Sequence, residues 1–340
     1  MRVLITGMGG ELGTKVAQLV EDQPDVERVV GLDIDPPRRR LRRAEFHRIH
    51  PRDHDRTEAL VHELAPQVVL HLAIYEPNAR CSPRTAGELT FQSTEAVLPA
   101  AARAGHLEQV VVRSGIEVYG RRHATSEPDE TAEPDPSTPF GRTLLHVERS
   151  AAAAGAESLA TVTCLRFAPI VGPHFPSPLG RLLRLPVVPV SMVSAHPFTV
   201  LHQDDAARAV MASLGARHEG AINVVAPGTV TPIGAVRAGG RIPLPVVGPG
   251  WFSARAWAEL AGSPIPDHVH ELLTRGRTAD GSLAAQVLGL RPQHPAHIVV
   301  EHLHDWAPLT YLSGTTATGP TRSSDTASPL LRVVPSPESS

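Results

Sequence analysis

The sequence predicts an α/β fold in which a doubly wound parallel sheet, covered by helices on both faces, is joined to a smaller C-terminal lobe. Three observations predict it. Short runs rich in Val, Ile and Leu alternate with longer segments of helical periodicity through the first half of the chain, as is typical of βαβ units. A glycine-rich turn directly follows the first run. Beyond about residue 167 the elements become shorter and proline is more frequent, which indicates a separate lobe.

Each predicted strand is a short run of β-branched and aliphatic residues, and each predicted helix carries apolar residues at helical spacing. The strands are expected at residues 3–6, 28–33, 45–49, 68–73, 109–114 and 161–166. The helices are expected at residues 12–21, 57–64, 85–103 and 139–154. We therefore predict one domain over residues 1–166 and a lobe over residues 167–310 that is interleaved with it. Residues 311–340, rich in Ser, Thr, Gly and Pro, are predicted to be a disordered tail.

Composition and charge exclude several classes of partner. The net charge is −3 and the isoelectric point is near 6.7, so the chain lacks the basic field that drives nucleic-acid binding. Two cysteines are too few for a disulfide framework and fit a reducing compartment. Met1 leads directly into a strand-like run without a signal peptide, and Pro186 and Pro189 interrupt an apolar stretch too short to span a membrane. We expect a soluble, cytoplasmic protein with no nucleic-acid or membrane partner.

The turn after the first predicted strand reads Thr6-Gly7-Met8-Gly9-Gly10-Glu11-Leu12-Gly13. Glycines at this G-x-x-G-x-x-G spacing allow a tight turn, close approach of a pyrophosphate, and close packing of the helix on the strand. The amide groups at the start of the helix then face the phosphates. The turn therefore predicts a Rossmann-type dinucleotide site formed by Gly7, Gly10, Glu11, Leu12 and Gly13.

Asp33 ends the second predicted strand, twenty residues beyond Gly13. A carboxylate there can accept hydrogen bonds from the adenosine ribose hydroxyls and repels the extra phosphate of NADP. NAD is therefore the expected cofactor. An alternative is open because the arginine-rich run at residues 38–43 could reach a 2′-phosphate and favour NADP, although a solvated basic loop is the simpler interpretation.

Further motifs follow the glycine turn in a fixed order. They are His71-Leu72-Ala73, Val118-Tyr119-Gly120, Leu165-Arg166-Phe167-Ala168-Pro169-Ile170-Val171-Gly172-Pro173, His202-Gln203-Asp204-Asp205-Ala206-Ala207 and Leu288-Gly289-Leu290-Arg291-Pro292. With the glycine turn they resemble the extended short-chain dehydrogenase/reductase family, in particular the NAD-dependent epimerase/dehydratase group. The resemblance covers almost everything but the tail. It implies a homodimer built from helices such as 85–103 and 139–154, and further cofactor contacts from His50, Leu72, Ala73 and Ser114.

The resemblance also identifies the positions at which this family carries its proton-transfer groups. Family members place a Ser or Thr after the fifth strand and a Tyr-x-x-x-Lys pair on the next long helix. The lysine lowers the pKa of the tyrosine, which then exchanges a proton with the substrate. The matching residues here are Gly115, Phe140 and Leu144. Because Lys15 is the only lysine in the chain, none of its three tyrosines has a lysine four residues on.

Two other residues are candidates for residual chemistry. Glu117 matches a glutamate that nucleotide-sugar dehydratases of this family use as a base, although its acidic companion is here Ile116. Tyr119 is the second candidate. A lone carboxylate can act as a base when burial raises its pKa, but a polar residue at the end of the sheet is the simpler interpretation. The catalytic residues of the family are thus replaced, with Glu117 and Tyr119 as tentative substitutes.

The sequence therefore favours an NAD-binding protein of the epimerase/dehydratase group that is catalytically impaired, a pseudoenzyme that works as a cofactor-dependent sensor or scaffold. The alternative is an active, divergent epimerase, dehydratase or oxidoreductase that acts on a nucleotide sugar or another alcohol or ketone with a non-standard acid or base. In either case the partner is a small-molecule ligand whose identity the residues do not specify.

The chain holds eighteen histidines, which raise the question of a metal site. Close pairs occur at His268/His270, His294/His297 and His302/His304. None has the spacing of a known metal motif, so no metal is expected. Asp204 and Asp205 are expected to serve the structure, one of them capping a helix at residues 206–214.

Overall fold

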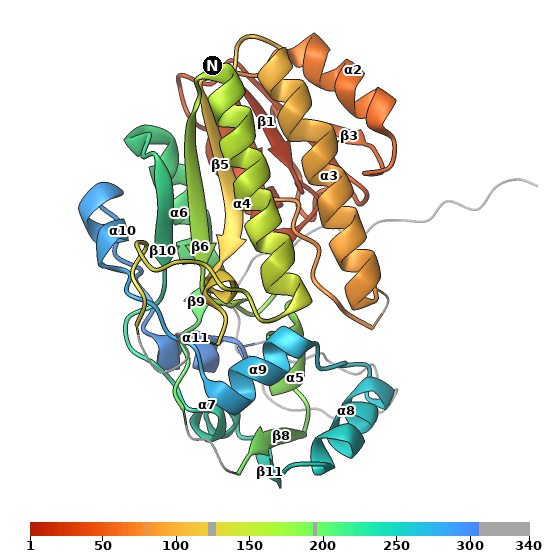
Figure 1. Cartoon of the computed structure of the whole chain (residues 1–340), viewed down its shortest axis with the longest axis vertical. Coiled ribbons are helices and arrows are strands. Elements are labelled where there is room, and N and C mark those ends of the chain that lie inside the picture. Colours follow the sequence, from red (N-terminus) through yellow and green to blue (C-terminus); the bar gives the residue numbers. More distant parts are fainter. Residues whose placement is uncertain (80, 122–126, 193–195, 306–340) are drawn as a thin grey trace, which may run out of the picture. The chain divides into compact units, whose positions relative to one another are not determined.

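The computed structural model describes residues 1–79, 81–121, 127–192 and 196–305, which lie in one compact unit (Figure 1). The predicted tail at 311–340 lies outside the described residues. The central sheet has seven strands in the order β10-β6-β5-β4-β1-β2-β3, and all neighbours pair in parallel. They are β1 (Arg2–Thr6), β2 (Arg28–Asp33), β3 (Glu45–Arg48), β4 (Val68–His71), β5 (Gln109–Gly115), β6 (Thr161–Phe167) and β10 (Gly220–Val224). This is the order of a doubly wound dinucleotide fold, and the predicted fold class is confirmed.

Helices cover both faces of this sheet. On one face α3 (Pro83–Arg103) packs between α2 (His54–Leu64) and α4 (Pro139–Ser158) (Figure 1). On the other face α1 (Glu11–Glu21) packs against α6 (Gln203–Ala216). The inner strands are consequently buried on both sides, which explains why they read as continuous apolar runs rather than as alternating patterns.

Capping residues decide where the long helices begin. Thr138 Oγ1 accepts a hydrogen bond from Gly141 N, and α4 starts at Pro139 as predicted. The helix α3 begins at Pro83, two residues before the predicted start. Ser82 Oγ caps it by accepting a hydrogen bond from Thr85 N, and Pro83 occupies the first helical position. Proline is favoured there because its missing N–H would be unpaired in any case.

The expected cap of α6 is wrong. The helix begins at Gln203, and the ring of His202 provides the cap, with its Nδ1 accepting a hydrogen bond from Asp204 N at 3.2 Å. Asp204 and Asp205 instead lie in the first turn. Their carboxylates form ion pairs, Asp204 with Lys15 and Asp205 with Arg208.

The second half of the chain adds a smaller lobe around its own apolar core. Its strands form two parallel pairs, β7 (Ile170–Val171) with β9 (Leu201–His202) and β8 (Val187–Ser191) with β11 (Ile242–Val246). Its helices are α5 (Pro178–Leu183), α7 (Pro232–Ala238), α8 (Gly250–Leu260), α9 (Asp267–Arg275), α10 (Ser282–Val287) and α11 (Ala296–His302). No helix among the described residues is long and apolar enough to cross a membrane.

Candidate active site

The glycine turn joins β1 to α1 where two backbone segments lie in close contact. Gly7 has a φ of +72°, and a Cβ there would lie 2.8 Å from Ala73 N. A Cβ on Gly13 would lie 2.0 Å from Gly7 O. Only glycine fits these two positions, so α1 begins directly against β1. No side chain of the described residues caps α1, and its first amide groups are available to an anion.

Asp33 lies beside this turn at the end of β2 and is almost completely buried. Its carboxylate accepts hydrogen bonds from Gly9 N at 2.9 Å and Ile34 N at 2.6 Å, and the Tyr75 hydroxyl donates to it at 3.3 Å. Burial raises the pKa of Asp33, while the two backbone amides and Tyr75 lower it. The carboxylate is thus held in a fixed position at the rim of a cleft.

The cleft has a volume of about 470 Å³ and lies over the carboxyl ends of the central strands. Most of the cofactor residues predicted from the sequence line it: Gly7, Gly10, Glu11, Leu12, Gly13, Asp33, Leu72 and Ala73. Two do not. His50 is exposed outside the cleft, where its Nδ1 accepts a hydrogen bond from Arg52 N. Ser114 is buried and donates its hydroxyl hydrogen to Glu148.

The arginine-rich run is largely engaged by neighbouring groups. Arg39 pairs with Glu11 at 3.0 Å, Arg42 pairs with Asp22, and Arg43 donates to Val26 O at 2.7 Å. Arg38 does line the cleft. The carboxylate of Asp33 lines the same cleft, so a 2′-phosphate there would meet a negative charge.

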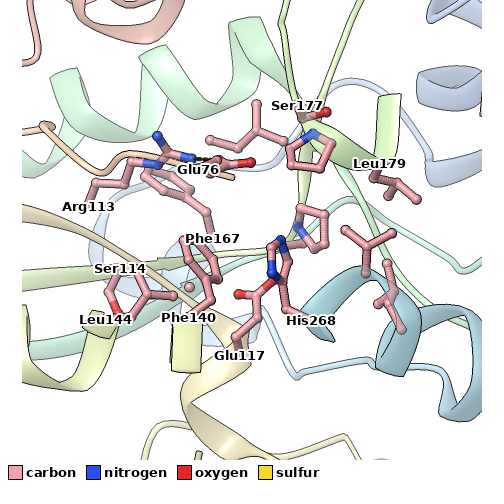
Figure 2. Close-up of a pocket in the computed structure, with 17 residues that line it drawn as sticks. Glu76, Arg113, Ser114, Glu117, Phe140, Leu144, Phe167, Ser177, Leu179 and His268 are labelled. Carbon is pink, nitrogen blue, oxygen red and sulfur yellow. Dashed lines mark hydrogen bonds and ion pairs between the residues drawn. The ribbon is translucent and has the colours of Figure 1, made fainter. Parts of the chain in front are cut away.

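The three positions of the family's proton-transfer groups lie together at the ends of β5, β6 and α4. Gly115, Phe140 and Leu144 line one cavity with Glu117 and His268 (Figure 2). The cavity has a volume of about 30 Å³, which is enough for about one or two water molecules. The three residues that the resemblance identifies as the family's proton-transfer positions therefore line one cavity, and their side chains carry no hydroxyl or ammonium group.

Glu117 takes up the space that a side chain at residue 115 would need. A Cβ on Gly115 would lie 2.3 Å from Glu117 Oε2 and 3.0 Å from Leu144 Cδ1. Glu117 lies in η1 (Ile116–Tyr119), a 3₁₀ helix of one turn that follows β5, and is only 7% exposed. Burial raises the pKa of its carboxyl group, and the charge of Arg277 opposes that shift.

His268, on α9, was not expected at this cavity. Its ring stacks on Phe140 with ring centroids 4.4 Å apart, and it lies next to the carboxyl group of Glu117 (Figure 2). Burial lowers the pKa of His268 to about 3. The imidazole is therefore neutral at physiological pH. No sequence signal joins residues 140 and 268, because only the folding of the second lobe brings α9 onto α4.

An ion pair stands between the cofactor cleft and this cavity. Arg113 on β5 pairs with Glu76, and both residues line both spaces (Figure 2). The guanidinium also lies 6.0 Å from the ring centroid of Phe175. A ligand that passes from the cleft to the cavity must meet or displace this pair.

Tyr119 is placed differently from Glu117. Its hydroxyl donates to Asn223 Oδ1 at 2.8 Å and accepts from Arg166 at 3.0 Å, inside the core beneath the site. The ring is 1% exposed and is not among the residues that line the cavity. Burial raises the pKa of Tyr119. The structure brings together Gly115, Glu117, Phe140 and Leu144, and leaves Tyr119 out.

A Rossmann-type cleft, with polar residues at the ends of the central strands and a second lobe beside it, is typical of proteins that bind a dinucleotide. The chain belongs to the NAD dependent epimerase/dehydratase family, whose model matches residues 3–224. It is 30% identical over 317 residues to the uncharacterized proteins Rv0501 of Mycobacterium tuberculosis and Mb0513 of Mycobacterium bovis. Each match covers 86% of this chain and 80% of the relative.

Solved structures share the fold at lower identity. MoeE5, solved in complex with UDP-glucuronic acid and NAD, is similar with a TM-score of 0.69 and 22% identity over 90% of this chain and 98% of that chain. UDP-glucuronic acid 4-epimerase from Bacillus cereus, solved with NAD, is similar with a TM-score of 0.67 and 19% identity over the same shares. These likenesses establish the fold of the whole described unit.

Proposed function

We propose that the chain binds NAD in the cleft beside Asp33 and has lost the proton transfer of its family, so that it acts as a cofactor-dependent sensor or scaffold. Family membership supports the cofactor, and two similar structures were solved with NAD. The cleft fits the group: the uncapped start of α1 would meet the pyrophosphate, and Asp33 would accept from the ribose. When bound, NAD supplies a hydride acceptor.

One observation carries the proposed impairment. The three proton-transfer positions hold Gly115, Phe140 and Leu144, and they close around a cavity of about 30 Å³. The only lysine, Lys15, is paired with Asp204 between α1 and α6 and cannot act in place of the missing one. Gly115, Phe140 and Leu144 therefore shape the cavity, but none of them carries a hydroxyl or ammonium group to move the proton of a ligand.

The second candidate function is an active enzyme that uses Glu117. Its carboxyl group is buried at the cavity, and this burial raises its pKa, which favours the protonated form relative to an exposed glutamate. Such an enzyme would act on a nucleotide sugar or on another alcohol or ketone, in keeping with MoeE5, which was solved with UDP-glucuronic acid and with UDP-glucose. Arg113 and Glu76 would then be the charged groups nearest to the substrate.

Cofactor binding is tested by titrating the purified protein with NADH and NADPH and following nicotinamide fluorescence. We expect saturable binding of NADH that is tighter than that of NADPH. Asp33→Asn should weaken NADH binding about tenfold or more, because a charged acceptor to the ribose is lost. Asp25→Asn, which removes an exposed carboxylate near the start of β2, is the matched control and should leave affinity unchanged. Tighter binding of NADPH than of NADH would contradict the assignment.

We also propose a homodimer formed through α3 and α4. The two helices pack side by side, and Phe91 on α3 is 50% exposed while it stacks on His146 of α4 at 4.7 Å. A large aromatic ring exposed on such a helix pair is suited to a partner surface. Light scattering should give twice 36.3 kDa for the wild type, and Phe91→Glu should give monomers.

Phe252→Glu is the control for this prediction, since Phe252 is 81% exposed on the smaller lobe and its replacement should leave the dimer intact. A monomeric wild type at micromolar concentration would refute the proposed assembly.

We further expect the protein to work in a reducing compartment such as the cytoplasm, which agrees with its two free thiols, Cys81 and Cys164.

A further inference from the structure

Three histidines from separate elements converge away from the cofactor cleft. His202 ends β9, His294 lies between α10 and α11, and His302 is the last residue of α11. One ring nitrogen from each lies within 4.8 Å of the other two. The ring centroids of His202 and His294 are 4.1 Å apart. The ring centroid of His302 lies 5.7 Å from that of His202 and 5.4 Å from that of His294. His202 is buried and the other two are partly exposed, so the cluster can be reached from solvent.

A carboxylate of the first turn of α6 orients one of these rings. His294 Nδ1 donates to Asp205 Oδ2 at 2.8 Å, which leaves its Nε2 as the acceptor that faces away from the carboxylate. Asp205 is itself fixed, because it also accepts from the backbone amides of Gln293 and His294. A histidine held by a carboxylate at one nitrogen and open at the other is the usual arrangement of a metal ligand.

His202 has a carboxylate at a similar place. Its Nδ1 accepts from Asp204 N, and Asp204 Oδ2 lies 3.6 Å from the same nitrogen. Binding of a cation at Nε2 requires the ring proton to be on Nδ1. After a small rotation of the His202 ring, Nδ1 would donate this proton to Asp204 Oδ2. The hydrogen bond that Nδ1 now accepts from Asp204 N would then be lost. Two consecutive aspartates thus serve two of the three rings.

The chemistry of the donor set points to one class of ligand. Three neutral imidazoles suit a divalent ion such as Zn²⁺, Co²⁺ or Ni²⁺, and the nearby carboxylates favour positive charge. Tetrahedral zinc with bonds of 2.0–2.1 Å brings its nitrogen ligands to about 3.4 Å from one another. The present spacing of up to 4.8 Å must therefore shrink by up to about 1.4 Å, and the stacked rings of His202 and His294 must tilt apart. His294 lies between helices, where such a shift needs no change in either helix.

We propose that His202, His294 and His302 bind one divalent transition-metal ion, which ties α11 to the start of α6. The helix α6 packs on β5 and β6 of the main sheet, whereas α11 packs on α7 of the smaller lobe. The metal thereby links the last helix of the described chain to the sheet that carries the cofactor cleft. It fills a structural role, and the site is independent of NAD binding.

The test uses the full chain without a polyhistidine tag, stripped with EDTA and dialysed. Zn²⁺ is titrated by calorimetry, and Co²⁺ is followed by its visible absorption, which is intense for tetrahedral coordination. His294→Gln and His302→Gln remove ligands without removing the cap of α6, which His202 provides. His297→Gln is the matched control, because His297 lies exposed on α11 outside the cluster.

We expect one tight site per chain, a tetrahedral cobalt spectrum, and a rise in Tm of about 3–6 °C at a hundredfold excess of Zn²⁺ over its dissociation constant. His294→Gln and His302→Gln should each weaken binding at least about a hundredfold and abolish the rise in Tm, while His297→Gln should leave both unchanged. Binding that persists in His294→Gln and His302→Gln, or the absence of any Zn²⁺-dependent change in Tm, would show that the three rings do not form the site and are only packed against one another, and would overturn the proposal.

Discussion

The wild-type protein, saturated with NAD, is expected to interconvert or oxidise nucleotide sugars far more slowly than about one per second, the low end of ordinary enzymatic rates. The physical reason is that Gly115, Phe140 and Leu144 carry no group that can exchange a proton at the positions where the family places its Ser or Thr, its Tyr and its Lys. A single well-placed acid or base contributes about a hundred- to ten-thousand-fold to a rate. The measurement is cofactor absorbance at 340 nm, together with product analysis, on a panel of UDP-sugars, alcohols and ketones.

Restoring the family's groups should raise the rate, and the structure dictates how this must be done. Serine at residue 115 collides with the carboxylate of Glu117, whose Oε2 would lie 2.3 Å from the new Cβ. Adding Glu117→Ala to Gly115→Ser, Phe140→Tyr and Leu144→Lys removes this close contact, which the threefold variant must relieve by moving the Glu117 side chain. We expect the fourfold variant to gain about a hundredfold or more over the wild type, and the threefold variant with Glu117 retained to gain far less.

The fourfold variant also places an ammonium group where Leu144 is 1% exposed. Its folding is checked by circular dichroism and by NADH binding before any rate is interpreted, because a buried lysine without a partner is destabilising. Wild-type turnover at about one per second that Glu117→Gln abolishes would overturn the sensor proposal and establish the divergent enzyme. Equal rates in the two multiple variants would show that Glu117 does not obstruct residue 115.

Of the single substitutions proposed for this protein, Glu148→Ala should lower the free energy of unfolding the most. Glu148 on α4 pairs with Arg166 on β6 through two hydrogen bonds of 2.9 and 2.8 Å, and both side chains are at most 10% exposed. Ser114 donates to the same carboxylate. Glu148→Ala leaves the guanidinium buried without its charge partner, which we expect to lower the free energy of unfolding by about 3–5 kcal/mol. Urea unfolding followed by circular dichroism measures it.

The surface pair of Arg28 and Glu45 supplies the control. It has similar bond lengths of 2.9 Å, but the two side chains are 35% and 46% exposed. Glu45→Ala should change the free energy of unfolding by less than about 1 kcal/mol, because water screens both charges. Comparable losses from the two substitutions would contradict the argument that burial, rather than bond geometry, sets the cost.

Local patterns were sufficient for the parts of the site that lie close together in the sequence. The turn from Gly7 to Gly13 and the carboxylate of Asp33 depend on a strand followed directly by a helix and a second strand, so their roles can be inferred from spacing. The positions of Gly115, Phe140 and Leu144 follow in the same way from the resemblance to the family. Ser114 and His50 were assigned to the cofactor from that resemblance alone, and neither lines the cleft.

The sequence by itself therefore determined the fold class, the glycine turn with the carboxylate of Asp33 after the second strand, and which residues stand at 115, 140 and 144, because short-range spacing and residue identity decide these features. The tertiary structure alone decided which distant side chains meet. It brings His268 onto Phe140, points the Tyr119 hydroxyl toward Asn223 and Arg166, and joins His202 to His294 and His302. Most of these contacts span about a hundred residues along the chain; the exceptions are the contact of Tyr119 with Arg166, which are 47 residues apart, and that of His294 with His302. Such contacts depend on how elements that are distant in the sequence pack together, and no local periodicity encodes that packing.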